Sequence, residues 1–115
     1  MFFKAGVLPE QVTAHGAEMP TRKRALIANG VIPHITQLAT SRSWNECDTS
    51  SDPHIHKTMW AIYFVHKGHA TFTVVGETFE AGPGDCITVP PGTTHVYKVA
   101  PGEEMELFYL GVATD

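Results

Sequence analysis

Three histidines have a spacing that could hold one metal ion. His54 and His56 lie two positions apart, and in a β-strand such residues point to the same face, so both imidazoles can reach one point. His95 opens a later strand directly after Pro90-Pro91-Gly92. If the two strands are antiparallel neighbours, His95 supplies a third ligand. Imidazole binds Fe, Zn, Ni and Cu, and three protein ligands leave positions open for water or substrate.

Two tyrosines are candidate catalytic groups near these histidines. Tyr97 stands two residues after His95, and Tyr63 stands two residues after Ala61. Strand alternation points both phenols inward, where they could orient a substrate or donate a proton. The alternative for both is core packing with a hydrogen-bonded hydroxyl.

Short runs of β-branched and aromatic residues, separated by Gly and Pro, must position these side chains. Residues 41–52 are polar and predict a loop, while residues 9–14 weakly predict a helical turn. The pattern is that of an all-β sandwich or barrel, and no segment suits the crossover helix of a parallel α/β sheet. The predicted strands are 23–27, 31–38, 55–66, 70–75, 78–81, 86–89, 95–99 and 106–112.

The length of 115 residues fits one domain, with 43% apolar and 17% charged residues. We predict an N-terminal arm over residues 1–20 and a single domain over residues 21–115. The formal net charge is -4. The one basic cluster, Arg22-Lys23-Arg24, is too short for a nucleic-acid surface and predicts a solvated loop or edge strand.

Cellular location is predicted from the cysteines and from apolar runs. Cys47 and Cys86 do not suggest a disulfide framework, which fits a reducing compartment. No run has the length of a membrane span, and the apolar start is too short for a secretory signal. We therefore expect a cytoplasmic protein with neither membrane nor nucleic acid as a partner.

Two segments resemble the motifs of the cupin family. His54-Ile55-His56 followed by Gly68 resembles the first motif, His-x-His, three or four residues, Glu, six residues, Gly. Residues 84–95, Gly-x5-Pro-x-Gly-x2-His, resemble the second motif at every core position. The motifs cover residues 54–95, and the strand pattern extends the likeness to most of the chain. The resemblance implies a double-stranded β-helix, or jelly roll, with metal ligands at His54, His56 and His95.

The chain departs from the family pattern at the fourth ligand. The Glu of the first motif falls on Ala61, or on Trp60 with the shorter spacing, and neither can bind a metal. The leading Gly of that motif falls on Asp48, and an Asn of the second falls on Val99. A three-histidine site remains, similar to that of certain thiol and diketone dioxygenases of this superfamily. A site without a carboxylate should favour an anionic or enolate-forming ligand.

The remaining candidate residues have simpler expected roles. His66 and His69 flank a turn and are expected to be exposed, while His34 is expected within a strand. Phe72 and Phe108 are expected in the core or in a pocket wall. Trp60 is expected either to narrow the barrel mouth or to pack at an interface.

These features predict a metal-binding cupin, and we favour a metal-dependent, dioxygenase-like enzyme acting on a small polar or carbonyl-containing molecule. The cofactor would be one divalent ion, Fe²⁺ first and Zn²⁺, Ni²⁺, Mn²⁺ or Cu²⁺ as alternatives. Three alternatives stay open: a non-catalytic ligand-binding module, an isomerase or lyase acting on a sugar acid or organic acid, and a barrel that has lost its metal. Glu104 or Glu106 could replace the missing ligand, although a solvated strand face is favoured. The resemblance, and edge strands that need covering, predict a homodimer.

Overall fold

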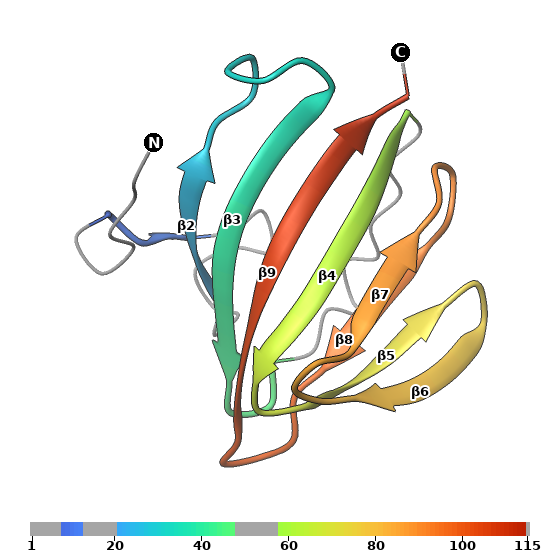
Figure 1. Ribbon diagram of the computed structural model, residues 1–115. Coiled ribbons are helices and arrows are strands. Elements are labelled where there is room, and N and C mark those ends of the chain that lie inside the picture. The colour runs from blue at the N-terminus through green and yellow to red at the C-terminus, as the bar shows by residue number, and fades with distance from the viewer. Residues whose placement is uncertain (1–7, 13–20, 48–57, 115) are drawn as a thin grey trace.

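The computed structural model describes residues 8–12, 21–47 and 58–114, which form two antiparallel β-sheets (Figure 1). One sheet has six strands in the order β1-β2-β3-β9-β4-β7, and the other has three in the order β6-β5-β8. The all-β prediction is therefore confirmed. The strands are β1 (Gln11–Val12), β2 (Thr21–Ile27), β3 (Ile35–Trp44), β4 (Met59–Lys67), β5 (Ala70–Val74), β6 (Glu77–Ala81), β7 (Cys86–Val89), β8 (His95–Lys98) and β9 (Glu104–Ala113).

The core lies between the inner faces of the two sheets. Side chains alternate along each strand, so that Ala61 and Val65 of β4 are buried while Trp60 and Phe64 are exposed. In Figure 1 the long strands β3, β9 and β4 run side by side across the large sheet. The buried cluster comprises Cys47, Ala61, Val65, Ala70, Phe72, Val74, Ala81, Ile87, Val89, Val99, Met105 and Leu107.

Strand β3 differs most from the sequence prediction. The predicted loop from residue 41 is wrong over residues 41–44, because β3 continues to Trp44 between β2 and β9. The polar side chains are accommodated there, since the buried hydroxyl of Ser43 lies 2.9 Å from that of Thr21. The predicted strand start at residue 31 is also wrong. Residues 31–34 form a turn in which the exposed His34 has a φ of 68°.

The segment around β1 also differs from its prediction. Gln11–Val12 forms a short strand that pairs with β2, which contradicts the predicted helical turn at these two residues. The remaining expected strands agree with the structure to within two residues at each described end. Residues 55–57 of the predicted strand 55–66 lie outside the described residues, and β4 is described from Met59. The boundary of the arm at residue 20 lies outside the described residues and stays a prediction. In the described part, no helix is long and apolar enough to cross a membrane.

Several single-residue expectations can be compared with the structure. Phe72 is buried in the core as expected, but Phe108 is 38% exposed on the outer face of the large sheet. The alternation of β9 causes this, because the neighbouring Leu107 takes the inward position. His66 is exposed as expected. His69 is half-buried, and its Nε2 lies 2.7 Å from a carboxylate oxygen of Glu103.

Gly68 marks the point where the chain leaves the large sheet for the smaller one. Its φ is +72°, in the left-handed region that favours glycine. A Cβ at this position would overlap the backbone carbonyl oxygen of Glu104 in β9. The glycine that closes the first sequence motif is thus required by backbone conformation and by close packing.

We predict that Gly68→Ala lowers the free energy of unfolding by about 2–4 kcal/mol, because backbone strain and overlap with a backbone atom add. Urea denaturation would measure the loss. Gly82→Ala is the matched control, since a Cβ there meets nothing closer than 3.9 Å, at Gly68 and His69. Equal stability of the two variants would contradict this account of Gly68.

Candidate metal centre

His95 lies inside the barrel at the start of β8. Its side chain is 6% exposed, and the residue pairs with Val74 of β5. The Nε2 atom lies 3.0 Å from the hydroxyl oxygen of Tyr63, and the Nδ1 atom lies 3.4 Å from the backbone oxygen of Thr93. The two contacts orient the imidazole so that Nε2 is directed across the interior toward β4.

The other two predicted ligands, His54 and His56, lie outside the described residues. Their convergence with His95 therefore stays a prediction. Ala61, at the position of the family's Glu, is wholly buried and lies opposite Gly111 in the strand register. A carboxylate at this position would face the interior, and the alanine offers no donor atom in its place.

Trp60 and Val99, the other described departures from the family pattern, lie away from the interior site. Trp60 is 41% exposed on the outer face of β4, so the expectation that it narrows the mouth is wrong. Strand alternation causes this, because Ala61 takes the inward position. Val99 is wholly buried in the core. Asp48 lies outside the described residues.

A chain of contacts leads from His95 through Tyr63 and Tyr109 to Met59 and Thr36, and we call these residues the His95 cluster. The ring centroid of Tyr63 lies 5.3 Å from that of Tyr109 on β9. The sulfur of Met59 accepts a hydrogen bond from the Thr36 hydroxyl at 2.8 Å and a longer one from the Tyr109 hydroxyl at 3.8 Å. The cluster comprises His95, Tyr63, Tyr109, Met59 and Thr36.

Gly111 makes room for the His95 cluster. A Cβ at Gly111 would overlap the Thr36 hydroxyl and would lie 2.7 Å from the Met59 sulfur. Met59 shares the inner face of β4 with Ala61 and Tyr63, because the three residues are spaced by two. Sequence reasoning missed Met59 and Tyr109, although the same alternation that selected Tyr63 extends one step back to Met59.

The phenols of the His95 cluster are held in their neutral form. Burial raises the pKa of Tyr109 to about 12. Burial, together with the neighbouring Tyr109 and Tyr97, raises the pKa of Tyr63 still further above its ordinary value. Among the described residues, the buried polar or charged side chains are Thr21, Ser43 and His95, so this part of the interior contains no buried carboxylate.

Tyr97 points inward as predicted, but its hydroxyl belongs to a different polar group. The hydroxyl oxygen lies 2.6 Å from that of Ser43, and Thr21 lies within 2.9 Å of both Ser43 and the Cys47 sulfur. Phe72 stands between Tyr97 and Tyr63, with ring centroids 5.4 and 6.2 Å away. This arrangement favours the packing alternative for Tyr97. Burial first, then Cys47, raises the pKa of Tyr97 to about 12.

Lys23 is an inward-facing cation that sequence reasoning missed. The basic cluster lies within β2, and alternation separates its members: Lys23 shares the inner face with Thr21, whereas Arg22 and Arg24 point outward. The Lys23 ammonium donates a hydrogen bond to the Gln37 side-chain oxygen at 3.1 Å. Burial lowers the pKa of Lys23. Gln37 lies opposite Gly111 in the register, which places this pair two strands from Ala61.

The sequence of this chain matches a known family of protein domains. The chain matches the cupin domain family over residues 46–112, more than half of its length, and is a member of that family. The jelly-roll prediction is therefore confirmed. The fourth-ligand position of the family is occupied by Ala61, as described above.

Solved structures give the same fold at low sequence identity. A predicted oxalate decarboxylase from Thermotoga maritima is 13% identical, with a TM-score of 0.86 over 98% of this chain and 99% of its own. The polyketide cyclase RemF from Streptomyces resistomycificus is 21% identical, with a TM-score of 0.80 over 100% and 80%. A sugar phosphate isomerase of the cupin superfamily from Silicibacter pomeroyi is 15% identical, with a TM-score of 0.81 over 99% and 76%. The search of curated proteins by sequence found no match.

We predict that the three tyrosines of this chain stay protonated in the native protein at pH values well above the ordinary phenol pKa of about 10. Because their pKa values are raised in the folded state, the stability they contribute is complete below about pH 10 and is lost as the pH rises toward about 12. Absorbance near the tyrosinate band and urea denaturation at stepped pH would measure both effects. A native titration midpoint near pH 10 would contradict the described interior.

Proposed function

We propose that this cupin is a metal-dependent enzyme that acts on a small carbonyl-containing or otherwise oxyanion-forming molecule inside the barrel. The observation that carries the proposal is the buried His95 imidazole with the Tyr63 hydroxyl 3.0 Å from its Nε2. An ion bound to Nε2 would take the lone pair that the Tyr63 hydroxyl now contacts, and the freed hydroxyl would donate to an oxygen beside the ion. A substrate oxygen held there would be within reach of both.

His54, His56 and His95 would hold the ion. The described part of this donor set fits such a role, because His95 is buried and directs Nε2 into the interior. Three imidazoles suit Fe²⁺, with Zn²⁺, Ni²⁺, Mn²⁺ or Cu²⁺ as alternatives. When bound, the ion supplies Lewis acidity and open coordination positions.

The residues of the chain would stabilise negative charge on the substrate. Tyr63 and Tyr109 carry phenols that remain protonated, so each can donate a hydrogen bond to an oxygen that becomes negative during the reaction. The described interior lacks a buried carboxylate that would compete for these donors or repel an anion. An enolate or a carboxylate is therefore the charge state that this interior favours.

Lys23 would bind the anionic end of the substrate. Its ammonium and Gln37 lie on the same inner face as Met59 and Ala61, about 10 Å away for two strand spacings. A molecule of a few carbon atoms can span that distance. We propose a small organic anion with one oxygen near His95 and its charged group near Lys23.

For the reaction we retain dioxygenase-like oxidation, and the other classes remain alternatives. The solved relatives are called a decarboxylase, a cyclase and an isomerase, so the fold alone selects no reaction. A non-catalytic binding role has a specific observation in its favour, because His95 is the one buried residue among those described that could act as a conventional general base. Oxygen uptake separates oxidation from isomerase or lyase chemistry, and turnover separates all three from simple binding.

We place the protein in the cytosol and expect a homodimer, both from the sequence. The thiols of Cys47 and Cys86 are free, which fits a reducing compartment. Light scattering at micromolar concentration measures the mass, and a monomer would contradict the dimer.

We predict about one equivalent of divalent metal per chain in protein purified without chelator, with the metal lost in His95→Ala. Elemental mass spectrometry measures the content. His66→Ala is the matched control, because the exposed His66 lies outside the barrel and should leave the metal content unchanged. Absence of metal after reconstitution with Fe²⁺, Zn²⁺, Ni²⁺, Mn²⁺ and Cu²⁺ would defeat the proposal and favour the binding module.

We predict that Tyr63→Phe keeps the metal but lowers kcat about 100- to 1000-fold, as expected for the loss of one oxyanion donor. Oxygen uptake with a panel of small 2-oxo acids, diketones and thiols, after metal analysis of each variant, measures the effect. Tyr97→Phe should reduce kcat far less, because its hydroxyl bonds Ser43 at the other end of Phe72. An equal loss of kcat in Tyr63→Phe and Tyr97→Phe would contradict this account and would make Tyr97 part of the active site.

A further inference from the structure

Three arginines gather on the outer face of the large sheet, on the side away from His95. Arg22 and Arg24 take the outward positions of β2, and Arg42 takes an outward position of β3 directly opposite Arg22. Like charges at directly opposed positions destabilise a sheet unless an anion compensates them. Trp44 supports two of these arginines, with its ring centroid 4.7 Å from the Arg42 guanidinium carbon and 5.8 Å from that of Arg22.

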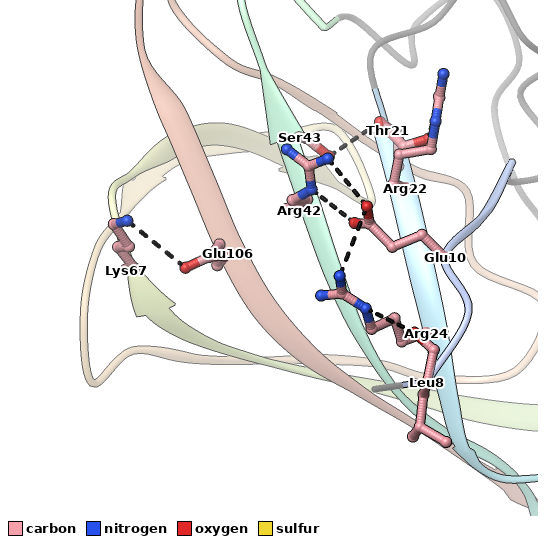
Figure 2. Close-up of polar contacts among 9 residues, drawn as sticks. All are labelled: Leu8, Glu10, Thr21, Arg22, Arg24, Arg42, Ser43, Lys67 and Glu106. Carbon is pink, nitrogen blue, oxygen red and sulfur yellow. Dashed lines mark hydrogen bonds and ion pairs between the residues drawn. The ribbon is translucent and has the colours of Figure 1, made fainter. Parts of the chain in front are cut away.

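Glu10 makes the direct contacts with this arginine group, and Glu106 lies opposite Arg42 in the strand register. Figure 2 shows the side chains of Arg24 and Arg42 converging on Glu10, just before β1. Arg42 donates two hydrogen bonds to Glu10, at 2.6 and 3.0 Å, in the fork geometry that guanidinium groups use for carboxylates. Arg24 lies farther from Glu10, at 3.7 Å, and donates its Nε hydrogen to the Leu8 backbone oxygen.

The arginines border a hollow that can accept a small molecule. Its volume is about 380 Å³, within the range of ligand sites. Leu26 and Phe108 supply an apolar wall, and the ring of His66 lies 4.9 Å from that of Phe108. The full lining is Glu10, Arg22, Arg24, Leu26, Thr40, Ser41, Arg42, His66, Glu106 and Phe108.

The charge of this hollow is opposite to that of the whole chain. Its lining contains three arginines and two carboxylates, Glu10 and Glu106, in a chain of formal net charge -4. Lys67, which does not line the hollow, pairs with Glu106 at 3.9 Å and partly offsets its charge. Figure 2 draws no contact between this pair and the Glu10 group, although Glu106 lies opposite Arg42 in the strand register. The hollow therefore has guanidinium charge in excess over the single carboxylate that bridges Arg24 and Arg42.

We propose that this outer hollow binds a small organic oxyanion, in which a phosphate or carboxylate group is joined to an apolar or aromatic body. The oxyanion contacts Arg24, Arg22 lines the same hollow, and the apolar body lies against Leu26 and Phe108. Glu10 is a resident carboxylate that competes with the ligand for the same guanidinium groups. The site lies on the opposite face of the sheet from the His95 cluster and does not depend on the function proposed for it.

Isothermal titration of the full chain with 1-naphthyl phosphate and with 1-naphthoate tests the proposal. Both are expected to bind one to one, and their comparison distinguishes phosphate from carboxylate as the preferred group. Neutral 1-naphthol and inorganic phosphate are expected to bind more weakly, because each offers half of the recognised chemistry. Binding of 1-naphthol as tight as that of both anions would overturn the role of the arginines.

Variants give effects of opposite sign. Arg24→Gln is expected to weaken binding about tenfold, the value of one charge-assisted contact. Glu10→Gln is expected to strengthen it, because the competing carboxylate is removed while the side-chain shape is kept. Lys98→Gln is the matched control, since it removes one positive charge from an exposed residue of β8 in the smaller sheet, outside the lining of the hollow. Arg22→Gln serves as a second variant if Arg24→Gln does not fold.

Three outcomes would overturn the proposal. Loss of affinity in Lys98→Gln equal to that in Arg24→Gln would mean a general charge effect. Unchanged affinity in both Arg24→Gln and Glu10→Gln would place the probe elsewhere. A wild-type dimer that does not bind the probe, and that becomes monomeric in Arg24→Gln, would identify the hollow as a subunit interface instead.

Discussion

The structure depends on the two-residue alternation of side chains along its strands. The long strands β3, β9 and β4 each have one face in the core, so a residue that enters the barrel from them has neighbours in sequence that do not. Because side chains alternate along β4, Ala61, Tyr63 and Val65 face inward while Trp60 and Phe64 face outward. The same rule gives the sheet two chemically different surfaces.

The consequence for the interior is a site of neutral donors beside one buried imidazole. The Tyr63 phenol contacts His95, and a chain of contacts continues through the Tyr109 phenol and the Met59 thioether to the Thr36 hydroxyl. Gly111 leaves the space that Thr36 and Met59 fill. Burial keeps the phenols protonated, so among the described residues Lys23, at the side, is the group that brings charge to this interior, to which a bound ion or a substrate would add. Such an interior stabilises an anion through oriented hydrogen bonds and leaves the positive charge of a cation uncompensated by the described residues.

The fold could be predicted from the sequence largely because turns depend on the conformational preferences of a few neighbouring residues. Gly68 and Gly92 both have positive φ angles, and both sit in motif positions that the sequence analysis used. The end of β3 could not be predicted in this way, because Ser43 is polar by itself and is buried only through its contact with Thr21, which lies 22 residues away. The polar composition of residues 41–44 favoured a loop, whereas a hydrogen bond between residues far apart in sequence stabilises them as part of a strand.

The candidate site was predictable to a similar extent. The second motif and strand alternation placed His95 and Tyr63 in the interior, whereas Tyr109 and Lys23 required the strand register to be known. Arg22, Lys23 and Arg24 read as one basic cluster in sequence, and only their membership of β2 shows that the middle residue faces the other way.

The division between the two faces also separates the chromophores of the protein. The chain contains three tyrosines and two tryptophans. All three tyrosines pack against the core, whereas Trp60 lies on the outer face and Trp44 lies beside the guanidinium groups of Arg22 and Arg42. Indole absorbs at longer wavelengths than phenol, so emission excited at that long-wavelength edge comes from Trp44 and Trp60 without the tyrosines. One unlabelled sample can then report whether a molecule has bound on the outer side of the sheet.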